Sequence, residues 1–122
     1  MLKNLTIKQI EEIITTAEQL NAKHLPSDRG VSPGSHDFRP YMKDRKMLVQ
    51  NVADLTHDAR MELMALMWIG RDFDGTFMEA LKYAHENSDQ GDVGYITDKS
   101  SALPTYLRKG LKKLHAEQKK SN

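Results

Sequence analysis

The histidines are the residues of this chain best suited to bind a metal ion or to transfer protons near neutral pH. They are His24, His36, His57, His85 and His115. Two histidines on one helix bind a metal together when they are four positions apart, as in H-E-x-x-H, and no pair here has that spacing. His57 precedes Asp58 at a predicted helix start, and His115 borders a basic helix face. We therefore predict solvated or capping histidines rather than metal ligands, with His36 beside Asp37 as the best remaining candidate site.

The sequence contexts that support nucleophilic catalysis or cofactor binding are missing. Ser32 lies in GVSPG at 30–34, which has the G-x-S-x-G spacing, but a nucleophile elbow joins a strand to a helix and the chain shows no strand pattern. GVSPG is also neither a Walker A loop nor a dinucleotide fingerprint. The chain has no cysteine, which excludes a thiol nucleophile, cysteine-ligated zinc and a disulfide scaffold. We predict no catalytic residue and no cofactor, and we rank an enzyme that uses the 24–40 loop as a lid below any binding role.

The segment Asp-Phe-Asp-Gly at 72–75 resembles the start of a calcium-binding loop. The twelve-residue ligand series is absent, and Glu79 comes too early to close it. We therefore interpret Asp74 or Thr76 as the cap of a following helix.

Charge is unevenly distributed along the chain although its net value is only +1. Residues 1–53 carry eight Lys/Arg and six Asp/Glu, residues 54–98 carry three and ten, and residues 99–122 carry seven and one. The acidic middle and the basic end are expected to neutralise each other within the fold or between subunits. The alternative is a basic surface that binds an acidic partner.

Two sets of cations are candidate contact residues. Arg71 follows a predicted helix end, where it is expected to donate to the last carbonyls or to pair with a carboxylate of the middle segment. The alternative for Arg71 is a buried cation that faces an anion or a partner. The second set lies on one side of the predicted last helix and would contact nucleic acid or an acidic partner. It consists of Arg108, Lys109, Lys112 and Lys113.

The element that positions these residues is a helix predicted over 57–70, where seven apolar residues follow one another from Leu63 to Ile69. Thr56 is the predicted N-cap and Gly70 the predicted stop. A helix that is apolar on all sides is the buried centre of a domain or a membrane span, and seven residues are too few to cross a bilayer. We therefore predict a buried central helix that includes Trp68.

Four further helices follow from apolar periodicity and end signals. They are predicted over residues 6–23, 41–54, 76–86 and 102–118. Thr6 with Gln9 and Thr76 with Glu79 have capping-box spacing. The apolar stripe of the first helix comprises Ile7, Ile10, Ile13, Ile14, Ala17 and Leu20.

The connections are predicted from proline, glycine and polar residues. Residues 24–40 form a long loop, in which Val31, Phe38 and Tyr41 would be the anchors, and residues 87–94 form a polar turn before one short turn at Tyr95. Residues 119–122 are expected to fray. Gly110 falls within the apolar stripe of the last helix, so another helix should approach it closely.

These elements give an all-α single domain over residues 1–122, built from about five helices. The stretch A-L-M-W-I-G-R at 65–71, Tyr95-Ile96, and L-x-x-Y-L-x-x-G-L at 103–111 resemble a short bacterial family of unknown function. That resemblance covers about residues 48–115 and implies a helical fold, but no activity.

The sequence therefore favours a non-enzymatic interaction or regulatory module. Its N-terminus lacks the apolar core of a signal peptide, so we expect a bacterial cytoplasmic protein that assembles with itself or with another protein. The alternative is a nucleic-acid-binding protein that uses the basic last helix.

Overall fold

The computed structural model describes residues 2–24, 39–87 and 92–120, and every regular element within these ranges is an α-helix. The helices are α1 (Ile7–His24), α2 (Arg39–Ala53), α3 (His57–Arg71), α4 (Phe77–Asn87), α5 (Asp92–Asp98) and α6 (Leu103–Lys120). The all-α prediction is confirmed. The described part holds six helices rather than about five, because residues 92–98, predicted as the end of a polar turn and one short turn, form the separate helix α5.

Helix α2 begins at Arg39, two residues before its predicted start, and α6 continues to Lys120, two residues beyond its predicted end. The predicted loop anchors Val31 and Phe38, and the loop residues His36 and Asp37, lie outside the described residues. Tyr41, the third predicted anchor, belongs to α2.

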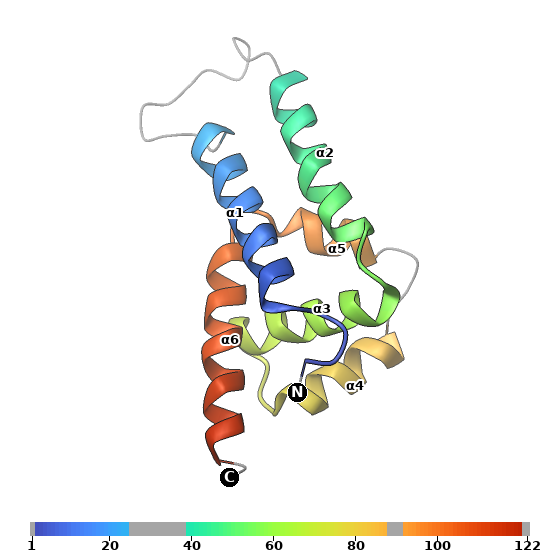
Figure 1. The fold of residues 1–122 in the computed structure, drawn as a ribbon, viewed down its shortest axis with the longest axis vertical. Coiled ribbons are helices and arrows are strands. Elements are labelled where there is room, and N and C mark those ends of the chain that lie inside the picture. Colours follow the sequence, from blue (N-terminus) through green and yellow to red (C-terminus); the bar gives the residue numbers. More distant parts are fainter. Residues whose placement is uncertain (1, 25–38, 88–91, 121–122) are drawn as a thin grey trace.

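Helix α3 lies in the middle of the fold, with α4 and α6 packed against it and α1 and α2 side by side above it in the view of Figure 1. Every residue from Met61 to Met67 is buried, which confirms the predicted central helix. The hydroxyl oxygen of Thr56 accepts a hydrogen bond from the amide of Ala59 at 3.1 Å, as expected of an N-cap. Trp68 differs from the prediction because it is only partly buried and faces a pocket.

Gly70 does not end α3, contrary to its predicted role. The helix continues through Arg71, and the amide of Asp72 still bonds to the carbonyl of Trp68 at 3.0 Å. A Cβ on Gly70 would overlap the carbonyl oxygen of Tyr106 and lie 2.7 Å from the amide nitrogen of Gly110. Gly70 therefore serves the crossing of α3 and α6, and tertiary packing overrides the usual preference for glycine after a helix end.

Gly110 lies on the other side of the same crossing. A Cβ there would overlap the carbonyl oxygen of Leu66 and lie 2.9 Å from its carbonyl carbon. The predicted close approach at Gly110 is confirmed, and its neighbour is the backbone of α3.

The N-terminal segment is attached to α3 by Glu62, a buried carboxylate within the apolar run. Its oxygens accept hydrogen bonds from the backbone amides of Lys3, Asn4 and Leu5 at 2.9–3.2 Å. Leu5 is therefore buried at that end of the core, whereas Ile7, predicted to be part of the buried stripe, is 44% exposed. The other five stripe residues are buried, and the Thr6–Gln9 capping box that begins α1 is confirmed.

The start of α4 is capped from two directions. The predicted capping box is confirmed, because the amide of Thr76 donates to Glu79 and the amide of Glu79 donates to the Thr76 hydroxyl, both at 3.1 Å. Glu117 of α6 also accepts from the amide of Phe77 at 3.1 Å. Asp74, the other predicted cap, is exposed.

No helix within the described ranges is long and apolar enough to pass through a lipid bilayer.

Candidate functional site

A pocket of about 770 Å³ opens between α3, α4 and α5. Aromatic rings dominate its wall, with charged side chains beside them. The lining residues are Met64, Trp68, Arg71, Asp72, Phe73, Tyr83, Asn87, Asp92 and Tyr95. Tyr83 is 51% exposed although it is a large aromatic residue, so its ring is accessible from solvent. The volume lies within the range of small-molecule sites, which is about 300–1,000 Å³.

Trp68 organises the aromatic wall. Its ring meets that of Tyr83 edge to face at 5.3 Å between centroids and that of Tyr95 at 6.4 Å. The indole N–H donates to the Tyr95 hydroxyl at 3.1 Å, which satisfies this donor and fixes the orientation of the indole. Phe73 lies against Tyr83 at 6.2 Å. The rings are therefore held in place by each other as well as by their helices.

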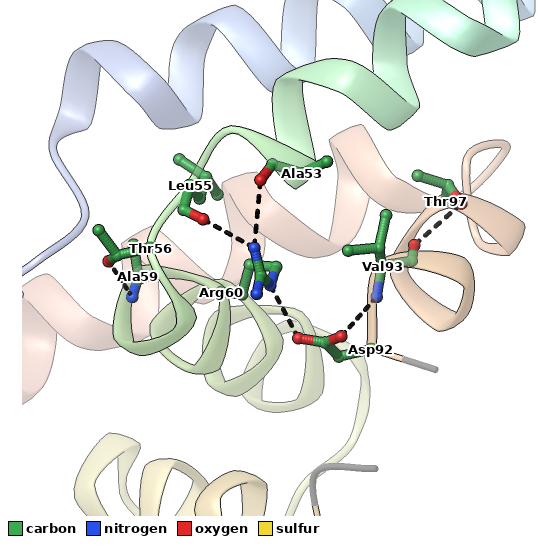
Figure 2. Close-up of polar contacts among 8 residues, drawn as sticks. All are labelled: Ala53, Leu55, Thr56, Ala59, Arg60, Asp92, Val93 and Thr97. Carbon is green, nitrogen blue, oxygen red and sulfur yellow. Dashed lines mark hydrogen bonds and ion pairs between the residues drawn. The ribbon is translucent and has the colours of Figure 1, made fainter. Parts of the chain in front are cut away.

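Arg60 and Asp92 fix the wall that α5 contributes (Figure 2). Arg60 Nε donates to Asp92 Oδ2 at 2.8 Å, and another guanidinium nitrogen donates to the carbonyl of Leu55 at 2.7 Å and to that of Ala53 at 3.3 Å. The two charged side chains are only 19% and 11% exposed. The guanidinium thus satisfies carbonyls at the end of α2 while it holds the first turn of α5 against α3.

Arg71 lies on the rim of this pocket, and its side chain is 47% exposed. The alternative of a buried cation is therefore wrong. Its Nε is 3.8 Å from Asp72 Oδ1, whose side chain is 80% exposed, so this pair is weak. A role for Arg71 as a contact for an anion or a partner stays a prediction. The pocket beside Arg71 is a place where such a ligand would bind.

The four cations predicted to form one basic surface have different surroundings. Arg108 makes a two-point ion pair with Glu18 of α1, at 2.9 and 2.8 Å. Hydrogen bonding from Arg108 holds the pKa of Glu18 below its ordinary value and raises the pKa of Arg108. Lys109, Lys112 and Lys113 are exposed, and none has an ion-pair partner among the residues that the structure describes.

The acidic middle segment forms ion pairs, but not with the cations that we expected. In the described part of the chain its carboxylates pair with Arg45, Arg60, Arg71 and Lys82, and none pairs with a cation of α6. The expected ion pairs between the acidic middle and the basic end are therefore absent within the described part of this chain. Ion pairs between these segments of two subunits stay a prediction.

Three side chains that no sequence pattern connects come together at one end of the α3–α4 pair. His57 and Asp58 begin α3, His85 belongs to the last turn of α4, and one donor atom from each lies within 4.8 Å of the others. The two imidazole rings are 6.1 Å apart at an interplanar angle of 61°. His57 and His85 are 28 positions apart, so no local spacing rule could have paired them.

The sequence patterns do not predict the pocket either. They predict a short apolar turn at Tyr95 and assign no functional role to Phe73 or Tyr83. The one signal for it was a set of aromatic residues outside the predicted apolar stripes, with Tyr83 among polar neighbours in α4.

A family described as "Protein of unknown function (DUF3775)" matches residues 45–116, more than half of the chain. The matched region contains every residue that lines the pocket, the histidine pair and both glycines of the α3–α6 crossing. Neither the curated proteins nor the solved structures contain a significant match to this chain. The matched residues agree closely with the 48–115 expected from the sequence, and the chain belongs to the DUF3775 family of proteins of unknown function.

Proposed function

We propose that this protein is a non-enzymatic binding module of the interaction or regulatory kind, and that the pocket between α3, α4 and α5 receives its ligand. The observation that supports the proposal is the solvent-accessible aromatic wall around Trp68, which lines a pocket of about 770 Å³. Large aromatic rings left open to solvent are characteristic of surfaces that bind a partner or a small molecule.

The wall favours a ligand with a flat apolar body. The rings of Trp68, Tyr83 and Tyr95 offer faces and edges on which another planar group could stack. The indole N–H is already used by the Tyr95 hydroxyl, so this donor does not demand a polar ligand atom. Stacking and apolar burial would therefore supply most of the affinity.

The charges at the rim favour an anionic end on this ligand. Asp92 is neutralised by Arg60, and the Arg71–Asp72 pair is exposed and long at 3.8 Å. A carboxylate or phosphate could displace Asp72 from Arg71 at little cost, because an exposed ion pair contributes only about 0–1 kcal/mol. The proposed ligand class is thus a planar aromatic acid, free or as part of a partner protein.

Trp68 is the only tryptophan of the chain, so its fluorescence reports directly on the pocket. We propose titrating the protein with benzoate, naphthoate and indole carboxylates, each compared with its neutral amide, while following emission and melting temperature. Binding should quench or shift the emission, and Arg71→Gln should abolish the preference for the acid over the amide.

A matched pair of variants on α4 separates the pocket from general surface effects. Tyr83 lines the pocket and is 51% exposed, whereas Met78 does not line it and is 52% exposed. Tyr83→Ala should weaken binding about 2- to 13-fold, since one aromatic contact contributes about 0.5–1.5 kcal/mol. Met78→Ala should leave binding unchanged. The proposal fails if no compound alters Trp68 emission or stability, or if both variants bind equally well.

Nucleic-acid binding by α6 is the second candidate function. It is supported by the exposed Lys109, Lys112 and Lys113, which lack ion-pair partners in the described part of the chain. It ranks lower because Arg108, the one arginine of the set, is already bonded to Glu18. Guanidinium groups make the two-point contacts that phosphates favour, and here that group is occupied.

A further inference from the structure

We propose that His57, Asp58 and His85 form a binding site for a divalent transition-metal ion, with Zn²⁺ the expected occupant. The three side chains are exposed, and one donor atom of each lies within 4.8 Å of the other two. This site is separate from the aromatic pocket, because none of the three residues lines that pocket. It therefore does not depend on the function proposed above.

The donor set suits a borderline-soft ion. Two imidazole nitrogens and one carboxylate oxygen are ligands that Zn²⁺ binds at about 2.0–2.2 Å, leaving a fourth position for water or a further ligand. Ions such as Mg²⁺ and Ca²⁺ prefer oxygen ligands and should bind poorly here. Tetrahedral bonds of this length separate neighbouring ligand atoms by about 3.4 Å. Exposed side chains can close the remaining distance by small rotations about their χ angles.

The backbone on both sides of the site is held in place without a metal. The cap of Thr56 on Ala59 fixes the first turn of α3, and α4 packs along α3. His57 belongs to α3 and His85 to α4, so an ion bound to both would link two helices that pack against each other. It would not merely join two neighbouring residues of one loop. That arrangement distinguishes the site from a pair of adjacent surface histidines.

The local electrostatics are compatible with a cation. The start of α3 has a positive dipole end, but Asp58 lies in that turn, and no other described residue pairs with its carboxylate. His85 lies in the last turn of α4, where the negative dipole end attracts a cation. The carboxylate and the end of α4 together offset the repulsion from the start of α3.

The test uses the full chain purified without a polyhistidine tag. Zn²⁺ binding is measured by calorimetry and by competition with a chromogenic chelator, and Co²⁺ is used as a spectroscopic substitute. One equivalent of Zn²⁺ should bind and raise the melting temperature in a concentration-dependent way, because a ligand of the folded state stabilises it. A chelator should reverse the shift, and Mg²⁺ should have no effect.

Single substitutions identify the ligands. His57→Ala and His85→Ala should each weaken Zn²⁺ binding at least about tenfold, because even changes outside the coordination sphere reduce affinity by about 10- to 100-fold. Asp58→Asn should also weaken binding. His115→Ala is the matched control, since His115 is an exposed helical histidine outside the cluster. This variant should bind Zn²⁺ with the affinity of the wild type.

The two histidines are exposed, so without metal the His57→Ala and His85→Ala variants should melt at the wild-type temperature. If His57→Ala melts lower because it alters the first turn of α3, His57→Gln and His85→Ala still provide the comparison. The proposal is overturned if His85→Ala binds Zn²⁺ as tightly as the wild type, if His115→Ala loses as much affinity as His85→Ala, or if Zn²⁺ leaves the melting temperature unchanged.

Discussion

Glu62 and Thr97 are the buried polar residues of the described chain, and Glu62 is the charged one. Burying a carboxylate is costly unless its oxygens are hydrogen-bonded. Here three consecutive backbone amides and the side-chain amide of Asn4 donate to it. The carboxylate thus satisfies the amides of a segment that precedes α1 and has no helical partners of its own.

Glu62→Gln should destabilise the protein by about 1–3 kcal/mol, because an amide accepts through one oxygen only and would leave backbone donors without partners. The free energy of unfolding from urea titration is the measurement. Glu11→Gln, an exposed substitution on α1, should change it by less than about 0.5 kcal/mol. Equal stabilities of the two variants would show that the N-terminal segment does not depend on Glu62.

The Glu18–Arg108 pair predicts a specific pH response. Arg108 holds the pKa of Glu18 below its ordinary value of 4.5, so the pair stabilises the fold above about pH 4.5 and this contribution is lost as the pH falls through the lowered pKa. An NMR titration of the Glu18 carboxyl carbon should give a pKa below 4.5 in the wild type. Arg108→Ala should raise it towards that ordinary value, whereas the neighbouring Lys109→Ala should leave it low. An unchanged pKa in Arg108→Ala would contradict the pair.

At the scale of elements, the crossing of α3 and α6 is the most extensive contact between helices in the described chain. Gly70 and Gly110 allow the two backbones to touch, and a side chain at either position would meet backbone atoms, which cannot rotate away. Gly94 of α5 is different, because a Cβ there would meet nothing within 4 Å. The three helical glycines therefore provide an internal comparison.

Gly70→Ala and Gly110→Ala should each destabilise the protein by about 1–3 kcal/mol, the usual cost of overpacking, even though alanine favours a helix by about 1 kcal/mol. Gly94→Ala should instead raise the stability by about 0.5–1 kcal/mol. Thermal and urea unfolding of the three variants provide the measurement. A higher melting temperature for Gly110→Ala would mean that the helices do not meet at this residue.

At the scale of the whole molecule, the basic end and the acidic middle do not neutralise each other in the described part of one chain. The exposed lysines of α6 are therefore available to a second copy, to an acidic partner or to nucleic acid. A second copy is the expected partner, because exposed carboxylates of the middle segment, such as Asp54, Asp74 and Glu79, supply the opposite charge.

Salt should distinguish these partners. If a second copy binds, added salt should lower the molar mass measured by light scattering, and replacing Lys109, Lys112 and Lys113 by glutamine should lower it already at low salt. The same changes at the exposed Lys43 and Lys46 of α2 serve as the control and should have little effect. Labelled duplex and single-stranded nucleic acid should bind weakly. Sub-micromolar binding near physiological salt, tighter than the usual non-specific range, would favour the nucleic-acid function instead.

The helical fold could be predicted because its signals are local. The capping pairs Thr6–Gln9 and Thr76–Glu79 act over three residues, and the apolar run in α3 requires burial in any arrangement. The close approach at Gly110 could be predicted because a glycine inside an apolar stripe weakens its helix unless a neighbouring backbone packs against it. Family membership also followed from short stretches of sequence.

The pocket, the histidine cluster and the role of Gly70 could not be predicted, because each depends on which helices become neighbours. The rings of Trp68 and Tyr95 belong to different helices and meet where α5 lies against α3, beside the Arg60–Asp92 pair. Gly70 satisfied the local rule for a helix end, but α6 occupies the space beside it and the helix continues. Local sequence specifies where helices form, whereas contacts between distant side chains arise from packing, and the candidate sites consist of such contacts.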